Sequence, residues 1–112
     1  MPKLSCILVL IFFSAAALAD VKPLPTSQWP TTVADAVPPV LAILTPTTRS
    51  IIRGTPKENL VLFQDQLGED IRVLLGLKKG NVQLVNAACG GPCTAEDATL
   101  RLMEALLEAL NK

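Results

Sequence analysis

Apolar side chains recur at helical spacing along most of the chain beyond residue 31, and this pattern predicts helices rather than strands. The longest repeat consists of Leu60, Phe63, Leu67, Ile71, Leu74 and Leu75. It follows a helix-start signal in which Thr55 is the expected N-cap, Pro56 takes the first helical position and Glu58 completes a capping box. We therefore expect a central helix over residues 57–75 that ends at Gly76.

Shorter helices are expected before this segment. Residues 33–44 carry a helical apolar stripe that Pro38 and Pro39 interrupt. Because proline removes an amide and disfavours helical geometry in the residue before it, we expect a turn, a kink and then helix to the end of this stretch. Residues 47–53 can form a second, short helix.

Two more helices are expected after the central one. Asn81 is the expected cap of a short helix, and Thr94, with Asp97 three residues later, opens a C-terminal helix over about 95–110. Asn81 and Asp97 are therefore interpreted as capping residues. The elements together predict an all-α fold of four to five helices, packed as a small irregular bundle because their lengths differ.

The first part of the chain differs from this helical region. Lys3 is followed by the apolar stretch 6–13, and Ala17-Leu18-Ala19 is a small-residue cleavage motif. This order is that of a secretory signal peptide over residues 1–19, cut between Ala19 and Asp20. The apolar stretch is too short to span a bilayer, and no other segment could do so after cleavage. We expect an exported protein, periplasmic or extracellular, with an extended proline-rich leader over 20–30 and one helical domain over 31–112.

Composition excludes several kinds of site. The chain has no histidine and no tyrosine, which removes Ser-His-Asp triads, Cys-His pairs and zinc sites with imidazole ligands. Lysine and arginine number 10 against 10 acidic residues, and no basic patch suited to nucleic acid is visible. The acidic turn of Asp65, Glu69 and Asp70 is expected to be a solvated face. We expect no cofactor and no metal.

A family resemblance runs through the helical region. The chain from Trp29 to Lys112 resembles a family of short bacterial helical proteins classed as a domain of unknown function. The matching residues are Leu67, Gly68, Ile71, Arg72, Gly76, Leu77, Gly80, Asn81, Leu84, Asp97 and Ala98. The chain departs from the family pattern at four polar or aromatic positions, which are Gln64, Val73, Lys78 and Thr99. The resemblance implies a compact helical fold in a bacterial protein and no known activity.

Two residues are candidates for contact with a partner. Arg72 lies at the edge of the central apolar face, where it could bind an anion or a partner. The alternative, which we favour, is a structural arginine bonded to Asp97 or to carbonyl groups at the Gly80-Asn81 turn. Trp29, the only tryptophan, could pack on the core or lie exposed for a partner.

Cys89 and Cys93 enclose the segment Gly90-Gly91-Pro92. A redox motif of the thioredoxin type has two intervening residues in a βαβ setting, and neither condition is met. A metal site would need further ligands, and the chain has no histidine to supply them. Export favours oxidation, so we expect a disulfide between the two cysteines, while a redox role, a metal role and free thiols stay open.

Three functions follow from these observations. The leading hypothesis is a non-catalytic binding protein whose target is another protein or the cell envelope. The second is a small enzyme that uses carboxylates and Arg72, which requires a cleft at that arginine. The third is a structural or stress-related protein of the envelope.

Overall fold

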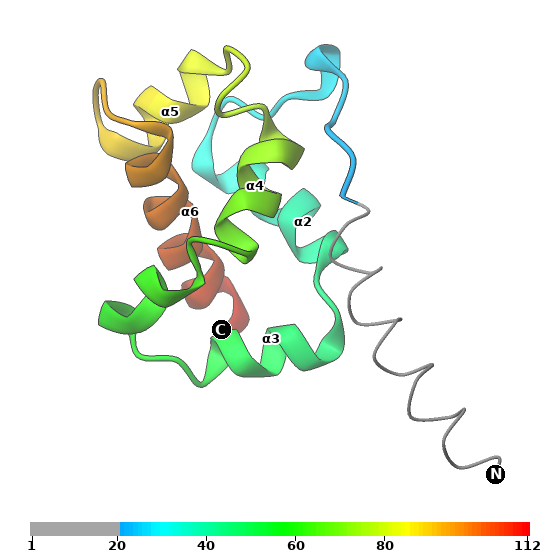
Figure 1. Ribbon diagram of the computed structural model, residues 1–112, viewed down its shortest axis with the longest axis vertical. Helices are drawn as coiled ribbons and strands as arrows, with labels where there is room; N and C mark the ends of the chain where they lie inside the picture. Colours follow the sequence, from blue (N-terminus) through cyan, green and yellow to red (C-terminus); the bar gives the residue numbers. More distant parts are fainter. Residues whose placement is uncertain (1–20) are drawn as a thin grey trace, which may run out of the picture.

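The computed structural model describes residues 21–112 and shows a small bundle of helices (Figure 1). In chain order they are η1 (Thr26–Gln28), α2 (Val33–Ile43), α3 (Pro46–Arg53), η2 (Lys57–Phe63), α4 (Leu67–Leu75), α5 (Val82–Cys89) and α6 (Ala95–Leu110), where η denotes a 3-10 helix. No residue of this part of the chain lies in a strand, which confirms the all-α prediction for it. The predicted signal peptide over 1–19 and its cleavage site between Ala19 and Asp20 lie outside the described residues.

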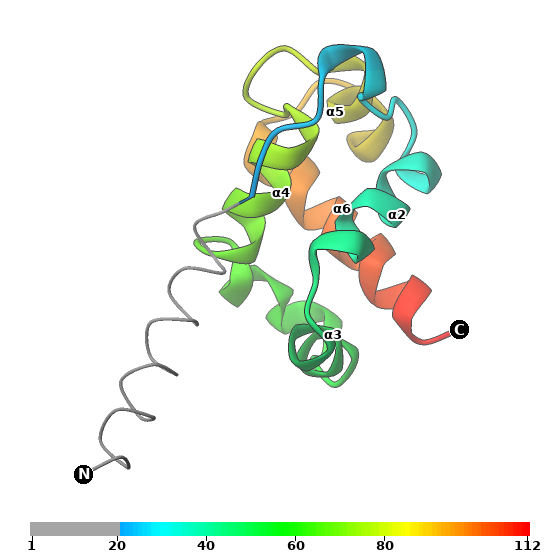
Figure 2. The same cartoon turned by 90° about the vertical axis from the view of Figure 1, so that its right-hand side faces the viewer.

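Helix α6 is the element around which the others pack. It contacts α2, α3, α4, α5 and η2, and its bounds agree with the predicted C-terminal helix. Thr94 caps it, because the Thr94 hydroxyl oxygen accepts a hydrogen bond of 3.0 Å from the Asp97 amide. At the other end, Arg53 Nε donates to the Leu110 carbonyl at 3.1 Å, so the ends of α3 and α6 lie side by side (Figures 1 and 2).

The predicted central helix over 57–75 is wrong, and the count of four to five helices is slightly low for the same reason. This segment consists of η2 and α4, separated by a turn at residues 64–66. Thr55 does not cap it: the Thr55 hydroxyl donates to the Ile51 carbonyl at 2.6 Å, at the end of α3, and η2 begins without a side-chain cap. The Gln64 carbonyl, which an unbroken helix would pair with the amide four residues on, accepts instead from Arg72.

Helix α2 is less interrupted than expected. It runs without a break over Val33–Ile43, with Pro38 and Pro39 inside it, and Thr32 caps its start. The prolines leave two carbonyl groups, those of Ala34 and Asp35, without an amide partner. Both of these residues are exposed, so water can satisfy their carbonyls and the helix continues.

The leader is packed against α4. The Leu24 amide donates to the Leu74 carbonyl at 3.0 Å, and Trp29 Nε1 donates to the Leu24 carbonyl at 3.2 Å. The Trp29 ring covers Gly76, where an added Cβ atom would lie only 2.4 Å from it. Trp29 therefore takes the packing role of its two predicted alternatives. Asn81 fixes the next connection, because its side-chain amide donates to the carbonyls of Pro30 and Leu75.

Candidate functional site

Arg72 lies inside the bundle and bonds to the chain itself. Its side chain is 7 % exposed, and all three of its nitrogen atoms donate. Nη1 and Nη2 reach the side-chain and main-chain oxygens of Gln64 at 2.8 Å each, and Nε reaches Glu69 Oε1 at 3.0 Å. The partners that the sequence suggested, Asp97 and the Gly80-Asn81 turn, are not among these. Three of the five N–H donors of this guanidinium are thus engaged within the chain, and little of the side chain is accessible to solvent.

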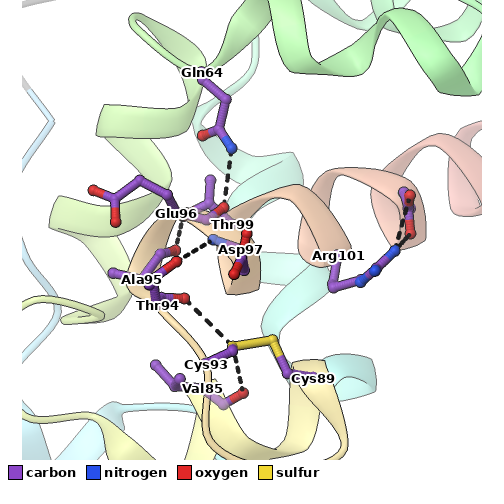
Figure 3. The surroundings of a disulfide bond; sticks show 11 residues. Gln64, Val85, Cys89, Cys93, Thr94, Ala95, Glu96, Asp97, Thr99 and Arg101 are labelled. Carbon is purple, nitrogen blue, oxygen red and sulfur yellow. Dashed lines mark hydrogen bonds and ion pairs between the residues drawn. A yellow bond between two sulfur atoms is a disulfide. The ribbon is translucent and has the colours of Figure 1, made fainter.

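Gln64 holds this arginine and was not predicted to have a role. While the Gln64 oxygens accept from Arg72, its side-chain nitrogen Nε2 donates to the Glu96 carbonyl at 2.9 Å. This bond ties the turn before α4 to the first turn of α6 (Figure 3). Asp97 is exposed, and its amide bonds to Thr94, so it sits in the first turn of α6 and does not join Arg72. Sequence periodicity gives no sign of Gln64, because its bonds depend on the break between η2 and α4.

Cys89 and Cys93 form a disulfide that joins the last residue of α5 to the residue before the Thr94 cap (Figure 3). Their Cα atoms are 6.3 Å apart. Gly90 and Gly91 both have positive φ, of 70° and 153°, so the loop between the cysteines needs the freedom of glycine at Gly90 in particular. Cys93 Sγ also lies 3.4 Å from the Thr94 carbonyl oxygen, a contact without a hydrogen bond, since a disulfide sulfur carries no proton.

A partly open pocket lies elsewhere in the described part of the chain, between the α2–α3 junction, η2 and the start of α4. Its volume is about 190 Å³. Its apolar walls are Val21, Ile43, Leu44, Ile51, Phe63 and Leu67. Its polar walls are Thr45, Thr48, Gln66 and Asp70. We call this site the apolar pocket.

Two further hollows lie along α2 and α6, with volumes of about 420 and 340 Å³. They share Val33, Ala105 and Glu108, and both are wider open to solvent than the apolar pocket. The larger one is lined by Arg101 and Glu104, which already pair with each other at 3.2 Å. These hollows are shallow surface grooves, so the apolar pocket is the better candidate site.

Asp70 is the titratable residue in the wall of the apolar pocket. Burial raises the pKa of its carboxyl group above 3.8, and the neighbouring charge of Glu69 raises it further. The two acidic neighbours differ in their partners. Glu69 pairs with Arg72 at 3.0 Å and with Lys78 at 3.9 Å, whereas within residues 21–112 the Asp70 carboxylate has no hydrogen-bond or ion-pair partner. Asp70 is thus not the fully solvated surface residue expected from the sequence.

Two of the other polar residues in the pocket wall, Thr45 and Thr48, hydrogen-bond to each other. Thr45 caps α3 by accepting from the Thr48 amide at 3.1 Å, and its hydroxyl donates to that of Thr48 at 3.0 Å.

Among the described residues no cluster of three or more potential ligands could hold a metal ion. Nor is any helix in this range long and apolar enough to cross a membrane.

Comparisons with protein-family models, with curated proteins and with solved structures give no match to this chain. The site is therefore interpreted from its own geometry.

Proposed function

We propose that this chain is an exported, non-catalytic binding protein that holds an apolar group in the apolar pocket. The observation that carries the proposal is a partly open pocket of about 190 Å³ whose wall contains six apolar residues. The predicted signal peptide supports export to a periplasmic or extracellular location. The family resemblance supports a bacterial source. The expected partner is thus a molecule or surface outside the cytoplasm.

The volume of the pocket limits what it can hold. Cavities of about 150 Å³ lined by aliphatic and aromatic side chains bind benzene, whereas sites for drug-sized ligands run from about 300 to 1,000 Å³. At about 190 Å³ the apolar pocket suits a group slightly larger than a benzene ring. Removing such a group from water stabilises the complex by about 25 cal/mol for each Å² of apolar surface buried.

The pocket wall is poorly equipped for catalysis. General acid–base chemistry on carboxylates uses two groups whose pKa values differ, and the wall contributes the carboxyl group of Asp70 alone. The alternative enzyme hypothesis also needs a free guanidinium at Arg72, and that group donates to Gln64 and Glu69. No contact in the described residues favours the structural or stress-related alternative, so we do not propose it.

Isoleucine methyl groups allow a direct test. Ile43 and Ile51 line the pocket, while Ile52 and Ile71 are fully buried in the core. Titration of the protein with benzyl alcohol, followed by NMR of labelled isoleucine methyl groups, should shift the two pocket signals with saturation. The two core signals should stay nearly unchanged and serve as an internal reference.

A pair of variants distinguishes binding in the pocket from non-specific binding of the ligand to exposed apolar side chains. Ile51 and Val82 are half-exposed aliphatic residues, at 52 % and 60 %, and Val82 on α5 does not line the pocket. Ile51→Ala should weaken benzyl alcohol binding about fivefold, because it removes apolar contact with the ligand. Val82→Ala should leave the affinity unchanged. Equal small shifts of all four methyl groups without saturation would contradict the proposal.

A further inference from the structure

We infer that the apolar pocket selects a small organic ammonium ion, with its apolar body between Ile51 and Phe63 and its charged amine paired with Asp70. This inference rests on the proposed function and names its ligand class. Two adjacent carboxylates, those of Glu69 and Asp70, differ in their partners. Glu69 has two cationic partners, and Asp70 has none among the described residues although it lines the pocket.

The electrostatics of α4 favour a cation at this position. Asp70 lies in the first turn of α4, where the helix N-terminus supplies about half a positive charge. That partial charge does not compensate for burial and for the charge of Glu69, because the pKa of Asp70 is raised all the same. An ammonium group would supply the missing positive charge, in surroundings that screen it less than water does.

Gln66 adds a second polar contact. It precedes Asp70 by four residues, so the two side chains lie on the same side of the first turn of α4, and both line the pocket. The Gln66 side chain makes no cap hydrogen bond. An ammonium group has three N–H donors, and a carboxylate together with an amide oxygen can accept them.

The same geometry disfavours other ligand classes. A carboxylate or phosphate ligand would meet the negative charge of Asp70, and no lysine or arginine lines the pocket to offset it. A divalent cation would need several oxygen ligands, and within residues 21–112 no group of three or more acidic residues, cysteines or histidines is arranged to hold a metal ion.

Three probes of equal size test the inference on the unchanged protein. Benzylamine is protonated at neutral pH, benzyl alcohol is neutral and benzoate is negative. Affinities are read from the methyl signals of Ile43 and Ile51, which line the pocket. Benzylamine should bind about tenfold more tightly than benzyl alcohol, as expected for a charge-assisted contact at a partly buried site, and benzoate more weakly than either.

A variant pair then assigns the preference to one residue. Asp70→Asn should abolish the advantage of benzylamine over benzyl alcohol. Asp65→Asn, at an exposed acidic residue that does not line the pocket, should keep the tenfold advantage. The probe comparison needs no variant, so it decides the question even if Asp70→Asn folds poorly.

The outcomes separate the two proposals. Equal affinities of the protein for benzylamine and benzyl alcohol would overturn the ammonium inference and leave the binding pocket in place. An advantage of benzylamine that survives in Asp70→Asn would overturn it as well. If neither probe shifts the pocket methyl groups, both the inference and the proposed function fail.

Discussion

Arg72 carries a full positive charge on a side chain that is only 7 % exposed. It is tolerated there because Glu69 supplies a counter-charge and Gln64 supplies two further acceptors. The bond to the Gln64 carbonyl also satisfies a backbone group that the break between η2 and α4 leaves free. At the scale of single residues, Arg72 therefore stabilises the turn that divides the predicted central helix.

Replacement of Arg72 tests this role. Arg72→Ala should lower the free energy of unfolding by about 2–3 kcal/mol, since it leaves the Gln64 carbonyl without its partner and Glu69 without its closer cation. Arg101→Ala is the matched control, because Arg101 forms an exposed pair with Glu104 and should cost less than about 0.5 kcal/mol. Urea denaturation followed by circular dichroism measures both. Equal small losses would show that Arg72 does not hold the turn.

Asp70 gives a pH dependence whose sign follows from its raised pKa. In the unfolded chain the Asp70 carboxyl group has its ordinary pKa of 3.8. The folded protein binds the proton of this group more tightly, because its pKa is raised there. The stability from this protonation is fully present below that value and is lost as pH rises through the pKa of the folded state. The variant Asp70→Asn lacks this titratable carboxyl group and keeps all other titratable groups of the wild type.

The unfolding free energy of the wild type, relative to Asp70→Asn, should therefore fall as pH rises from about 3 to about 6. We expect a change of a few tenths of a kcal/mol, because solvent screens a partly exposed group. Denaturation curves of both proteins at several pH values give this difference. A difference that rises with pH would mean that a cation already pairs with Asp70 in the folded protein.

Individual elements differ in how well their sequence signals predict them. The cap, the apolar face and the length of helix α6 all follow from its own local sequence, which begins at the Thr94 cap. The predicted bounds therefore agree with the structure. The start signal at Thr55 was misleading because Thr55 bonds backward to Ile51, while the later break depends on Arg72. Hydrogen bonds from side chains to main-chain carbonyl groups are not encoded in the apolar periodicity, and such bonds decided the outcome here.

The docking of the leader on α4 predicts a contrast between two glycines. Gly76 and Gly80 have positive φ, of 70° and 109°, so alanine strains the backbone at both. A Cβ atom at Gly76 would also lie 2.4 Å from the Trp29 ring, whereas one at Gly80 would meet nothing within 4 Å. Gly76→Ala should thus cost at least about 1 kcal/mol more than Gly80→Ala, because it also displaces buried aromatic surface.

Tryptophan fluorescence reports the displacement itself. Trp29 is the only tryptophan, and the chain has no tyrosine. The emission should shift to the red in Gly76→Ala and stay in place in Gly80→Ala. An unchanged emission in Gly76→Ala would show that Trp29 does not pack on this turn.

The Cys89–Cys93 disulfide predicts a modest and purely structural effect. Its loop is so short that closing it contributes only about 2 kcal/mol to stability. Neither cysteine lines the apolar pocket. Cys89→Ala combined with Cys93→Ala should lower the unfolding free energy by about that amount and leave benzyl alcohol binding unchanged. Loss of binding in a folded double variant would assign the loop a functional role.

The whole molecule explains why the pocket escapes prediction from sequence. Its walls come from Val21 before η1, from the α2–α3 junction, from η2 and from the start of α4. These segments meet only because the chain breaks at residues 64–66, which the local pattern does not indicate. The sequence predicts the helical class of the fold and the disulfide, whereas its candidate residues Arg72 and Trp29 lie outside the wall of the apolar pocket.

A crystal structure of the protein grown with benzylamine tests the central claim most directly. We predict electron density for one ligand in the apolar pocket, its ring against Ile51 and Phe63 and its nitrogen within about 4 Å of the Asp70 carboxylate, the range of an ion pair. A pocket closed by its own side chains, or filled by residues that precede Val21, would contradict the account.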